Sequence, residues 1–240
     1  MRRFFVPPEA LQSDRVVLPP EESRHATAVL RLRSGERIIV FDGRGQDYLV
    51  ELTAVTPRVV EGRVIETHAG ARPAVHLTLV QGVPKGAKMD TIIRMGTELG
   101  IARFVPVLTR RAVTRPAPAR VDRWRRIAAA AAKQSGRSTL PEVTAPRPVA
   151  QVWPGLSGTL ALIPWEGEKS RSLAMVLQAY RRPPAVTICI GPEGGWAEEE
   201  IRAAVAQGVH PVTLGPLILR TETAGLVTAA MVFYEFSLRA

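Results

Sequence analysis

The chain has 240 residues, of which 46% are hydrophobic and 22% charged, and this composition excludes a disordered tail, a collagen-like repeat and a small disulfide scaffold. The length predicts one large or two modest domains, and the net charge of +10 suggests a polyanionic partner. No apolar run reaches the roughly 18 residues of a membrane span, and prolines interrupt the first apolar segment before a signal peptide develops, so we expect a cytoplasmic protein with no membrane contact.

The first 70 residues are predicted to form a small β-barrel, because short β-branched and aromatic runs alternate with turn residues. The turn DGRG at 42–45 joins two of these runs in a hairpin. Glycine and proline punctuate the segment 69–73, where we place a domain boundary. The predicted elements are strands at 16–18, 37–41 and 48–55 and a helix at 21–32.

From residue 73 to residue 240 strands and helices alternate, which predicts an α/β domain with a mostly parallel sheet and helices on both faces. Such sheets bind ligands in the loops beyond the carboxyl ends of their strands. The predicted strands lie at 75–80, 104–107, 160–163, 186–190 and 212–214, and the predicted helices at 87–99, 120–134, 171–180, 197–207 and 221–238.

The last of these helices is apolar on every side, with Glu235 as the sole charge between residues 223 and 238. A helix of this kind must be buried. Internal packing accounts for such burial, and a homodimer interface explains so continuous an apolar surface at least as well. We therefore expect a homodimer.

Positive charge is concentrated in the middle of the chain, where residues 73–150 hold 14 basic and 4 acidic residues. Arginine predominates, and its planar guanidinium suits phosphate contacts and stacking on bases. On the helix predicted at 120–134, Arg123, Arg126 and Lys133 share one face, whereas Trp124 and its apolar neighbours share another that can face the core. A solvated face and DNA binding remain alternatives, but the shortage of balancing acids favours binding to an RNA backbone.

Cysteine and histidine usage indicates neither a disulfide nor a metal site. Cys189 is the single cysteine, and its apolar run at 186–190 is typical of a buried thiol rather than a nucleophile. The four histidines have no second ligand at metal spacing, so we expect no metal. His25 recurs with Val29 and Leu32 at helical spacing, which favours a core histidine over a ligand.

The segment 82–89, GVPKGAKM, follows a predicted strand and opens a helix, as a phosphate-binding P-loop does. Three residues rather than four separate its glycines, and Met89 replaces the Ser or Thr that binds magnesium. A nucleotide triphosphatase is therefore disfavoured, and Lys85 and Lys88 are expected to extend the basic surface.

Two glycine turns carry the strongest signal for a ligand site. The first, GPEGGW at 191–196, follows a predicted buried strand, and the acidic helix start after it favours a ligand of cationic character over NAD or ATP. The second, LGPLILR at 214–220, follows the next strand and leads into a helix that Thr221 can cap. We expect the two loops to be neighbours that hold an adenosine between apolar walls.

The ordered set of motifs resembles the 16S rRNA (uracil-N3)-methyltransferase family, RsmE. The resemblance rests on GPEGG at 191–195, LGP at 214–216 and ILRTETA at 218–224, with QSGR at 134–137, ELGI at 98–101, VLRL at 29–32 and FDG at 41–43. Essentially the whole chain is covered.

This resemblance implies a PUA-like β-barrel over residues 1–70 and a SPOUT-type parallel sheet with a C-terminal trefoil knot over residues 73–240. General topology rules disfavour knots, so the residue patterns alone predict an unknotted sheet. The family also implies a homodimer, S-adenosyl-L-methionine as methyl donor, and a target uridine (position 1498 in the usual rRNA numbering) in 16S rRNA of the assembled small ribosomal subunit.

The resemblance and the loop positions together assign candidate site residues. Those for the cofactor are Leu162, Ile190, Gly191, Pro192, Glu193, Gly194, Gly195, Leu214, Gly215, Leu219, Arg220 and Thr221, and those for RNA are Arg110, Arg111, Arg123, Arg126, Lys133 and Arg137. Three positions depart from the family pattern. Leu217 replaces a frequent Arg, Ala197 replaces a helix-capping Ser, and Lys133 replaces a common Glu.

Arg220 and Glu222 are the candidate catalytic residues. Uracil N3 is a weak acid, so we expect Glu222 to accept its proton or orient the base, and Arg220 to stabilise the carbonyls or hold a phosphate. A loop ion pair and a first-turn helix carboxylate are the structural alternatives. Rival functions are a non-enzymatic RNA-binding or ribosome-assembly factor and a SPOUT ribose 2′-O-methyltransferase.

Overall fold

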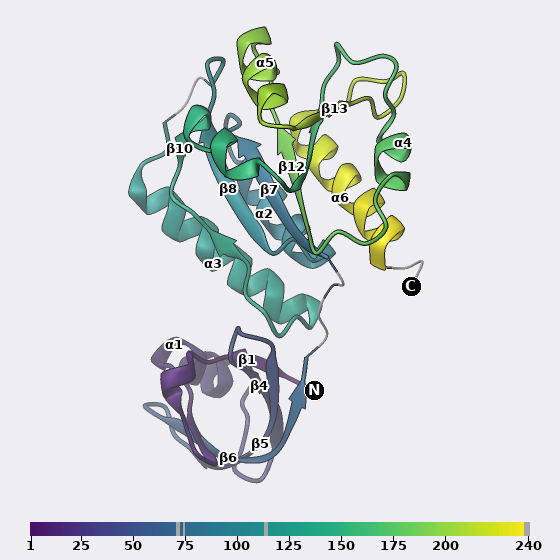
Figure 1. Cartoon of the computed structure of the whole chain (residues 1–240). Helices are drawn as coiled ribbons and strands as arrows, with labels where there is room; N and C mark the ends of the chain where they lie inside the picture. The colour runs from purple at the N-terminus through teal and green to yellow at the C-terminus, as the bar shows by residue number, and fades with distance from the viewer. Residues whose placement is uncertain (71–72, 74, 113–114, 238–240) are drawn as a thin grey trace. The chain divides into compact units, whose positions relative to one another are not determined.

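The computed structural model describes residues 1–70, 73, 75–112 and 115–237 (Figure 1). The chain divides into two compact units, one formed by residues 1–72 with 129–140 and the other by residues 73–128 with 141–240. The expected boundary at 69–73 includes residues 71 and 72, which lie outside the described residues. The division into 1–70 and 73–240 therefore stays a prediction.

The first unit is a curled six-stranded sheet in the order β1-β4-β5-β6-β3-β2, antiparallel except for the parallel pair β1 and β4 (Figure 1). Register shifts after Leu49 and after Leu52 interrupt the β5–β6 pairing, and such bulges increase the twist of a sheet. Its elements are β1 (Arg3–Phe5), β2 (Leu11–Gln12), β3 (Arg15–Val17), α1 (Pro20–Arg24), β4 (Arg37–Phe41), β5 (Gln46–Val55) and β6 (Val60–Ala69).

The interior of the curled sheet is aliphatic and aromatic. Alternate residues of β4, Ile38 and Val40, are fully buried, as a half-buried strand requires. Phe4, Val16, Leu18, Val50, Leu52 and Val60 complete this core. The strand predicted at 37–41 is confirmed with its bounds, and a barrel-like first unit is confirmed.

The interpretation of His25 as a core residue is wrong. The helix expected over 21–32 is instead α1 followed by a π-helical turn (His25–Val29), which changes the angular spacing of the side chains. As a result Ser23 and Ala26 are buried, whereas His25 is exposed and Val29 is 66% exposed. The ring of His25 lies edge-on to Phe4 at 6.3 Å.

The segment 129–140 is held to the curled sheet by main-chain hydrogen bonds. Gly45 N donates to Ser138 O at 3.0 Å, and Leu140 N donates to Gly43 O at 2.9 Å. The turn itself is organised by Asp42, whose Oδ1 accepts hydrogen bonds from the backbone N–H groups of the three residues Arg44, Gly45 and Gln46. The Asp42 carboxylate therefore accepts hydrogen bonds from backbone N–H groups instead of from water.

The second unit is a parallel sheet in the order β10-β8-β7-β12-β11-β13, with β9 also paired to β8. Its strands are β7 (His76–Gly82), β8 (Arg103–Leu108), β9 (Glu142–Val143), β10 (Arg147–Pro148), β11 (Leu160–Pro164), β12 (Ala185–Ile190) and β13 (His210–Val212). Its helices are α2 (Lys88–Leu99), the first part of α3 (Pro118–Ser135), α4 (Leu173–Gln178), α5 (Glu198–Ala206) and α6 (Thr221–Ser237).

Alternating side chains of this sheet pack into two separate cores, one on each face. Within β12, Val186, Ile188 and Ile190 join the core that α2, α3, α4 and α6 cover. Cys189 points to the other face, toward the core that includes Trp153 and residues of α5. Burial raises the pKa of its thiol, so the predicted inert core cysteine is confirmed. The α/β class with helices on both faces is confirmed as well.

Within the single chain, helix α6 is buried on one side, and burial of its other side in a homodimer stays a prediction. It packs against α2, β7 and β12 through Ala229, Val232 and Phe233. On its other side Met231 is 44% and Tyr234 57% exposed. Residue 238, the predicted end of the helix, lies outside the described residues. Within the described ranges, no helix combines the length and apolarity needed to cross a bilayer.

Candidate active site

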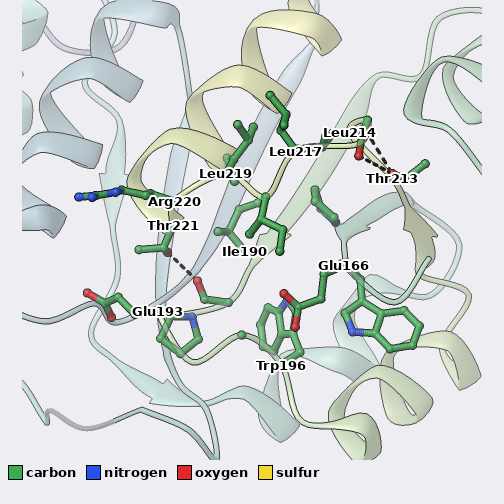
Figure 2. A pocket seen from close by; sticks show the side chains of 18 of the residues that line it. Glu166, Ile190, Glu193, Trp196, Thr213, Leu214, Leu217, Leu219, Arg220 and Thr221 are labelled. Atoms are coloured by element: carbon green, nitrogen blue, oxygen red, sulfur yellow. Dashed lines mark hydrogen bonds between the residues drawn. The ribbon is translucent and has the colours of Figure 1, made fainter. Parts of the chain in front are cut away.

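A cavity of about 410 Å³ opens at the carboxyl ends of the parallel strands of the second unit (Figure 2). Three loops form it: one after β11, one after β12 and one after β13. Apolar walls come from Ile190, Leu214, Leu219 and the Trp196 ring. The cavity therefore stands where open parallel sheets bind ligands.

The first glycine loop, residues 191–196, is packed so tightly at Gly191 that a side chain there would be crowded. A Cβ on Gly191 would lie 3.0 Å from the carbonyl carbon of Gly195, and a Cβ on Gly82 would lie 2.6 Å from Pro192 Cδ. The end of β7 is thus packed directly against this loop. At Gly191 the loop therefore presents main chain rather than a side chain to the cavity, as close approach of a ligand requires.

Thr221 joins the two glycine loops. Its hydroxyl donates a hydrogen bond to Gly191 O at 2.6 Å (dashed in Figure 2) and accepts one from Gln81 Nε2 at 2.9 Å. The hydroxyl expected to cap α6 is therefore used to tie β7, the first loop and the helix start together. The loops are neighbours as predicted, although β11 separates β12 from β13 in the sheet.

Three charged side chains meet at one edge of the cavity. Lys88 Nζ lies 3.0 Å from Glu193 Oε1 and 3.4 Å from Glu222 Oε2. The hydrogen bond to Glu193 is the main cause of the raised pKa of Lys88. Burial works to raise the pKa of Glu193, but hydrogen bonds from its own N–H, the Lys88 ammonium and the Lys85 N–H outweigh it, so that pKa is lowered.

Most of the predicted cofactor residues are brought together. Those that line the cavity are Ile190, Gly191, Pro192, Glu193, Gly195, Leu214, Gly215, Leu219, Arg220 and Thr221. Two do not line it. Leu162 is fully buried in the core, because its side chain points into the helical layer, and Gly194 turns its carbonyl to the Arg111 guanidinium at 2.8 Å.

The two candidate catalytic residues lie close to each other in the chain but differ in setting. Arg220 lines the cavity and is exposed, and within the described part of the chain its guanidinium has no hydrogen-bond or ion-pair partner. Glu222 is outside the cavity lining and reaches its edge through the contact with Lys88. Arg220 is thus available to a ligand, whereas Glu222 is held by the protein.

Four of the candidate RNA residues belong to the second unit. Arg111 contacts the first glycine loop, and Arg110 pairs with Glu199 while its N–H donates to Glu200 Oε1 at 2.8 Å. On α3, Arg123 Nε lies 2.9 Å from Asp90 Oδ2, and Arg126 donates to the carbonyl of Asp122 at 3.4 Å. The face opposite these arginines, with Trp124 and Ala128, is buried as predicted.

The other two candidate RNA residues belong to the first unit, where their side chains bond to neighbouring residues. Lys133 Nζ lies 2.7 Å from Glu22 Oε1 and 5.9 Å from the centre of the Phe4 ring. Arg137 donates to Thr139 Oγ1 at 3.2 Å, and burial lowers the pKa of its guanidinium to about 10. The carbonyl of Arg137 accepts a hydrogen bond from Arg3, which also pairs with Asp47 at 2.9 Å.

Sequence reasoning missed one wall of the cavity and one cation. Trp165, Glu166 and Lys169 follow β11, so the rule that ligands lie beyond strand ends could have found them. From the sequence, Lys88 is predicted to extend the basic surface. Instead it lines the cavity.

The lining suits a ligand that carries both signs of charge on an apolar body. It contains two carboxylates, Glu166 and Glu193, and three cations, Lys88, Lys169 and Arg220. S-adenosylmethionine has this character: a sulfonium, an amino-acid end with an ammonium and a carboxylate, and an adenosine that apolar walls can hold. Among the described residues, no group of three or more metal-ligating side chains gathers in one place.

Comparison with known families and relatives agrees with this geometry. A family model for an RNA methyltransferase domain matches residues 71–233, and one for an RNA methyltransferase PUA domain matches residues 18–65. A ribosomal RNA small subunit methyltransferase E from Synechocystis sp. is 35% identical over 96% of this chain and 76% of its own length. One from Bacillus subtilis is 30% identical over 99% of this chain and 98% of its own length.

Two solved structures match over all or nearly all of the chain. A ribosomal RNA small subunit methyltransferase E from Neisseria gonorrhoeae, bound to S-adenosyl methionine, has a TM-score of 0.90 at 32% identity and covers 100% of both chains. A methyltransferase structure from Legionella pneumophila with the bound cofactor SAM has a TM-score of 0.83 at 30% identity, over 97% of this chain and 96% of that one.

Proposed function

Because the chain belongs to the ribosomal RNA small subunit methyltransferase E family, we propose that it transfers a methyl group from S-adenosylmethionine to N3 of a uridine in 16S rRNA. The observation that carries this proposal is the cavity that two glycine loops and Thr221 build at the strand ends. A protein that only binds RNA has no need of such a cavity.

In this proposal the cofactor-binding site consists of main-chain groups and apolar side chains. Ile190, Leu214 and Leu219, which form apolar walls of the cavity, would hold the adenine ring, and the backbone of the two loops would bond its edges. Glu193 and Glu166 supply negative charge for the sulfonium or the ammonium. The bound cofactor supplies an electrophilic methyl group on sulfur.

Arg220 and Glu222 are the residues proposed to act on the uracil. Glu222 accepts the N3 proton, and the electron pair freed on N3 forms the new bond to the methyl carbon, whose former bonding pair stays on sulfur. Arg220, which is exposed at the cavity, stabilises the negative charge that develops on the uracil carbonyls. Positioning of N3 in line with the methyl group is the remaining contribution of the site.

The finer features of the proposal concern domains, assembly and substrate. Residues 1–70 act as a PUA-like RNA-binding domain and residues 73–240 as a SPOUT domain with a trefoil knot, in a cytoplasmic protein that modifies the assembled small subunit. Arg110, Arg111, Arg123, Arg126, Lys133 and Arg137 are the proposed RNA contacts.

A homodimer is proposed from the apolar surface of two packed helices. Met95 and Leu99 of α2 are 42% and 41% exposed, and Met231 and Tyr234 of α6 are exposed to a similar degree or more. Because α2 and α6 pack together, these side chains form one surface whose burial in a second copy is favourable.

The test offers labelled methyl donor with naked 16S rRNA or assembled small subunits and locates the label by mass mapping of nucleosides. We expect label on uridine N3. Label on a ribose would favour the 2′-O-methyltransferase alternative, and absence of both label and cofactor binding would favour the RNA-binding factor.

Substitution of the proposed base tests the residue roles. Glu222→Gln is expected to lower kcat by about 10²–10⁴ with unchanged cofactor affinity. The matched control is Glu198→Gln, an exposed glutamate on α5 that pairs with Arg202, which should leave kcat unchanged. Wild-type turnover in Glu222→Gln would remove Glu222 from the role of base.

A further inference from the structure

We infer that Lys88 is a positioning residue of this active site: it holds the carboxylates of Glu193 and Glu222 together at the edge of the cavity, so that Glu222 faces the substrate. The inference rests on the proposed function. It concerns a residue from the P-loop-like segment 82–89.

The three side chains come from three separate elements. Lys88 is the first residue of α2, Glu193 lies in the loop after β12, and Glu222 lies in the first turn of α6. The Lys88 ammonium is 3.0 Å from one carboxylate and 3.4 Å from the other, and each of the three side chains is between 22% and 33% exposed. One cation therefore bridges two partly buried anions.

Glu222 depends on this cation more than Glu193 does. Glu193 also accepts hydrogen bonds from the Lys85 N–H at 3.1 and 3.3 Å. Glu222 Oε2 is buried and accepts no well-aligned hydrogen bond from the residues that the structure describes. A buried carboxylate oxygen without a hydrogen bond is costly unless an opposite charge compensates it, and Lys88 is the charge beside it.

Loss of the Lys88 ammonium would leave the two carboxylates facing each other. Like charges at this range repel, and the site relieves the repulsion when one carboxylate turns away or takes up a proton. Either change removes Glu222 from its role of proton acceptor. The Lys88 ammonium already forms ion pairs with two carboxylates. The prediction that Lys88 extends the basic surface is therefore wrong.

The variants that test this inference are Lys88→Met, Lys88→Arg and the control Lys85→Met. Methionine is an unbranched side chain one atom shorter than lysine, and it removes the charge. Lys85 is an exposed lysine three residues earlier whose side chain lies outside the cavity lining, and its backbone N–H survives the substitution. We expect Lys88→Met to lower kcat about tenfold with KM for RNA within twofold of wild type, Lys88→Arg to restore part of kcat, and Lys85→Met to keep kcat.

The deciding readout is the effect of the same substitution in a Glu222→Gln background. If Lys88 acts through the Glu222 carboxylate, Lys88→Met should change kcat there by less than twofold. An equal loss in both backgrounds would show a general structural role and overturn the inference. So would an unchanged kcat with a raised KM for RNA and a weaker salt dependence, which marks a phosphate contact.

The failure of the proposed function would appear differently, because wild-type protein would then transfer no methyl group to uridine N3. Cofactor affinity measured by calorimetry on each variant shows whether the cavity is intact. A Lys88→Met protein that binds the cofactor as wild type does and still turns over at the wild-type rate would refute the role of Lys88 while the proposed function stands.

Discussion

The two glycine loops of the cavity are fixed to very different degrees. The first loop spans residues 191–196. Hydrogen bonds tie its residues Glu193 and Gly194, and the start of the helix after it, to other segments of the chain. In the second, residues 214–220, the Thr213 hydroxyl bonds to the backbone of Gly215 at 3.2 Å, while Leu217 and Ile218 are 78% and 81% exposed. The first loop is a preformed scaffold, and the second has side chains left for a ligand to bury.

This difference indicates a division of labour. A preformed loop places main-chain groups without a further ordering cost, and a loosely packed one can close over what it binds. Substitutions in the first loop and its supports should therefore reduce stability, and substitutions at the tip of the second should reduce affinity alone.

Gly82→Ala is expected to have the largest effect, because its Cβ would lie 2.6 Å from Pro192 Cδ and 2.7 Å from Pro192 N. Backbone must shift to admit it, and overpacking of this kind costs about 3 kcal/mol of unfolding free energy. Cofactor affinity should fall at least about tenfold. Denaturant unfolding measures the loss of stability, and calorimetry measures the loss of affinity. Gly86→Ala is the control, because Gly86 has a φ of +65° and open space around it, so an added Cβ strains the backbone there without a steric clash. A Gly82→Ala protein as stable as wild type would show that the first loop is not a rigid support.

Thr221→Val removes the hydroxyl that links the two loops. Gly191 O then loses a 2.6 Å hydrogen bond and Gln81 Nε2 loses an acceptor, which should cost about 2 kcal/mol of unfolding free energy. Thr221→Ser keeps the hydroxyl and serves as the matched control. Equal stabilities of the two variants in urea would contradict the proposed link.

Ala197→Ser should stabilise the protein by about 1 kcal/mol. Ala197 already has N-cap backbone angles, φ −76 and ψ 149, and its N–H donates to Glu200 Oε2 at 2.9 Å. A serine hydroxyl would supply the missing half of a capping box. Ala203→Ser, at an exposed position within α5, should instead destabilise slightly, and thermal unfolding of the pair distinguishes capping from any general effect of serine.

Leu217→Ala should have the smallest effect, about a threefold loss of cofactor affinity with unfolding free energy within about 0.5 kcal/mol of wild type. Leu217 is 78% exposed and lines the cavity. Leu219→Ala, in the same loop but packed against the core as well as lining the cavity, should lose stability in addition to cofactor affinity. A stability loss in Leu217→Ala would contradict the contrast between the loops.

Local patterns predicted much of the second unit. The five strands and five helices expected there are all present within a few residues of their predicted ends, because each parallel strand is a short apolar run between helical patterns. The start of α6 at Thr221 is confirmed. Both glycine loops reach one cavity, since the carboxyl ends of parallel strands share one edge of the sheet.

Features that depend on distant partners escaped prediction. Strand β1 is only three residues long and pairs in parallel with β4, more than thirty residues away. Strand β6 has a run of exposed residues from Ile65 onward, so it lacks the alternation by which a half-buried strand is recognised. The place of Lys88 in the site was not predicted for the same reason, because it depends on contacts with Glu193 and Glu222, which are remote in the chain.

Hydrogen exchange of the purified protein with and without millimolar S-adenosylmethionine tests the central claim most directly. Binding at the cavity predicts new protection at residues 191–196 and 214–220, with the larger increase in the second loop, which is less protected beforehand. If the cofactor protects neither loop, the cavity does not bind S-adenosylmethionine, and the proposed methyl transfer has no site in this chain.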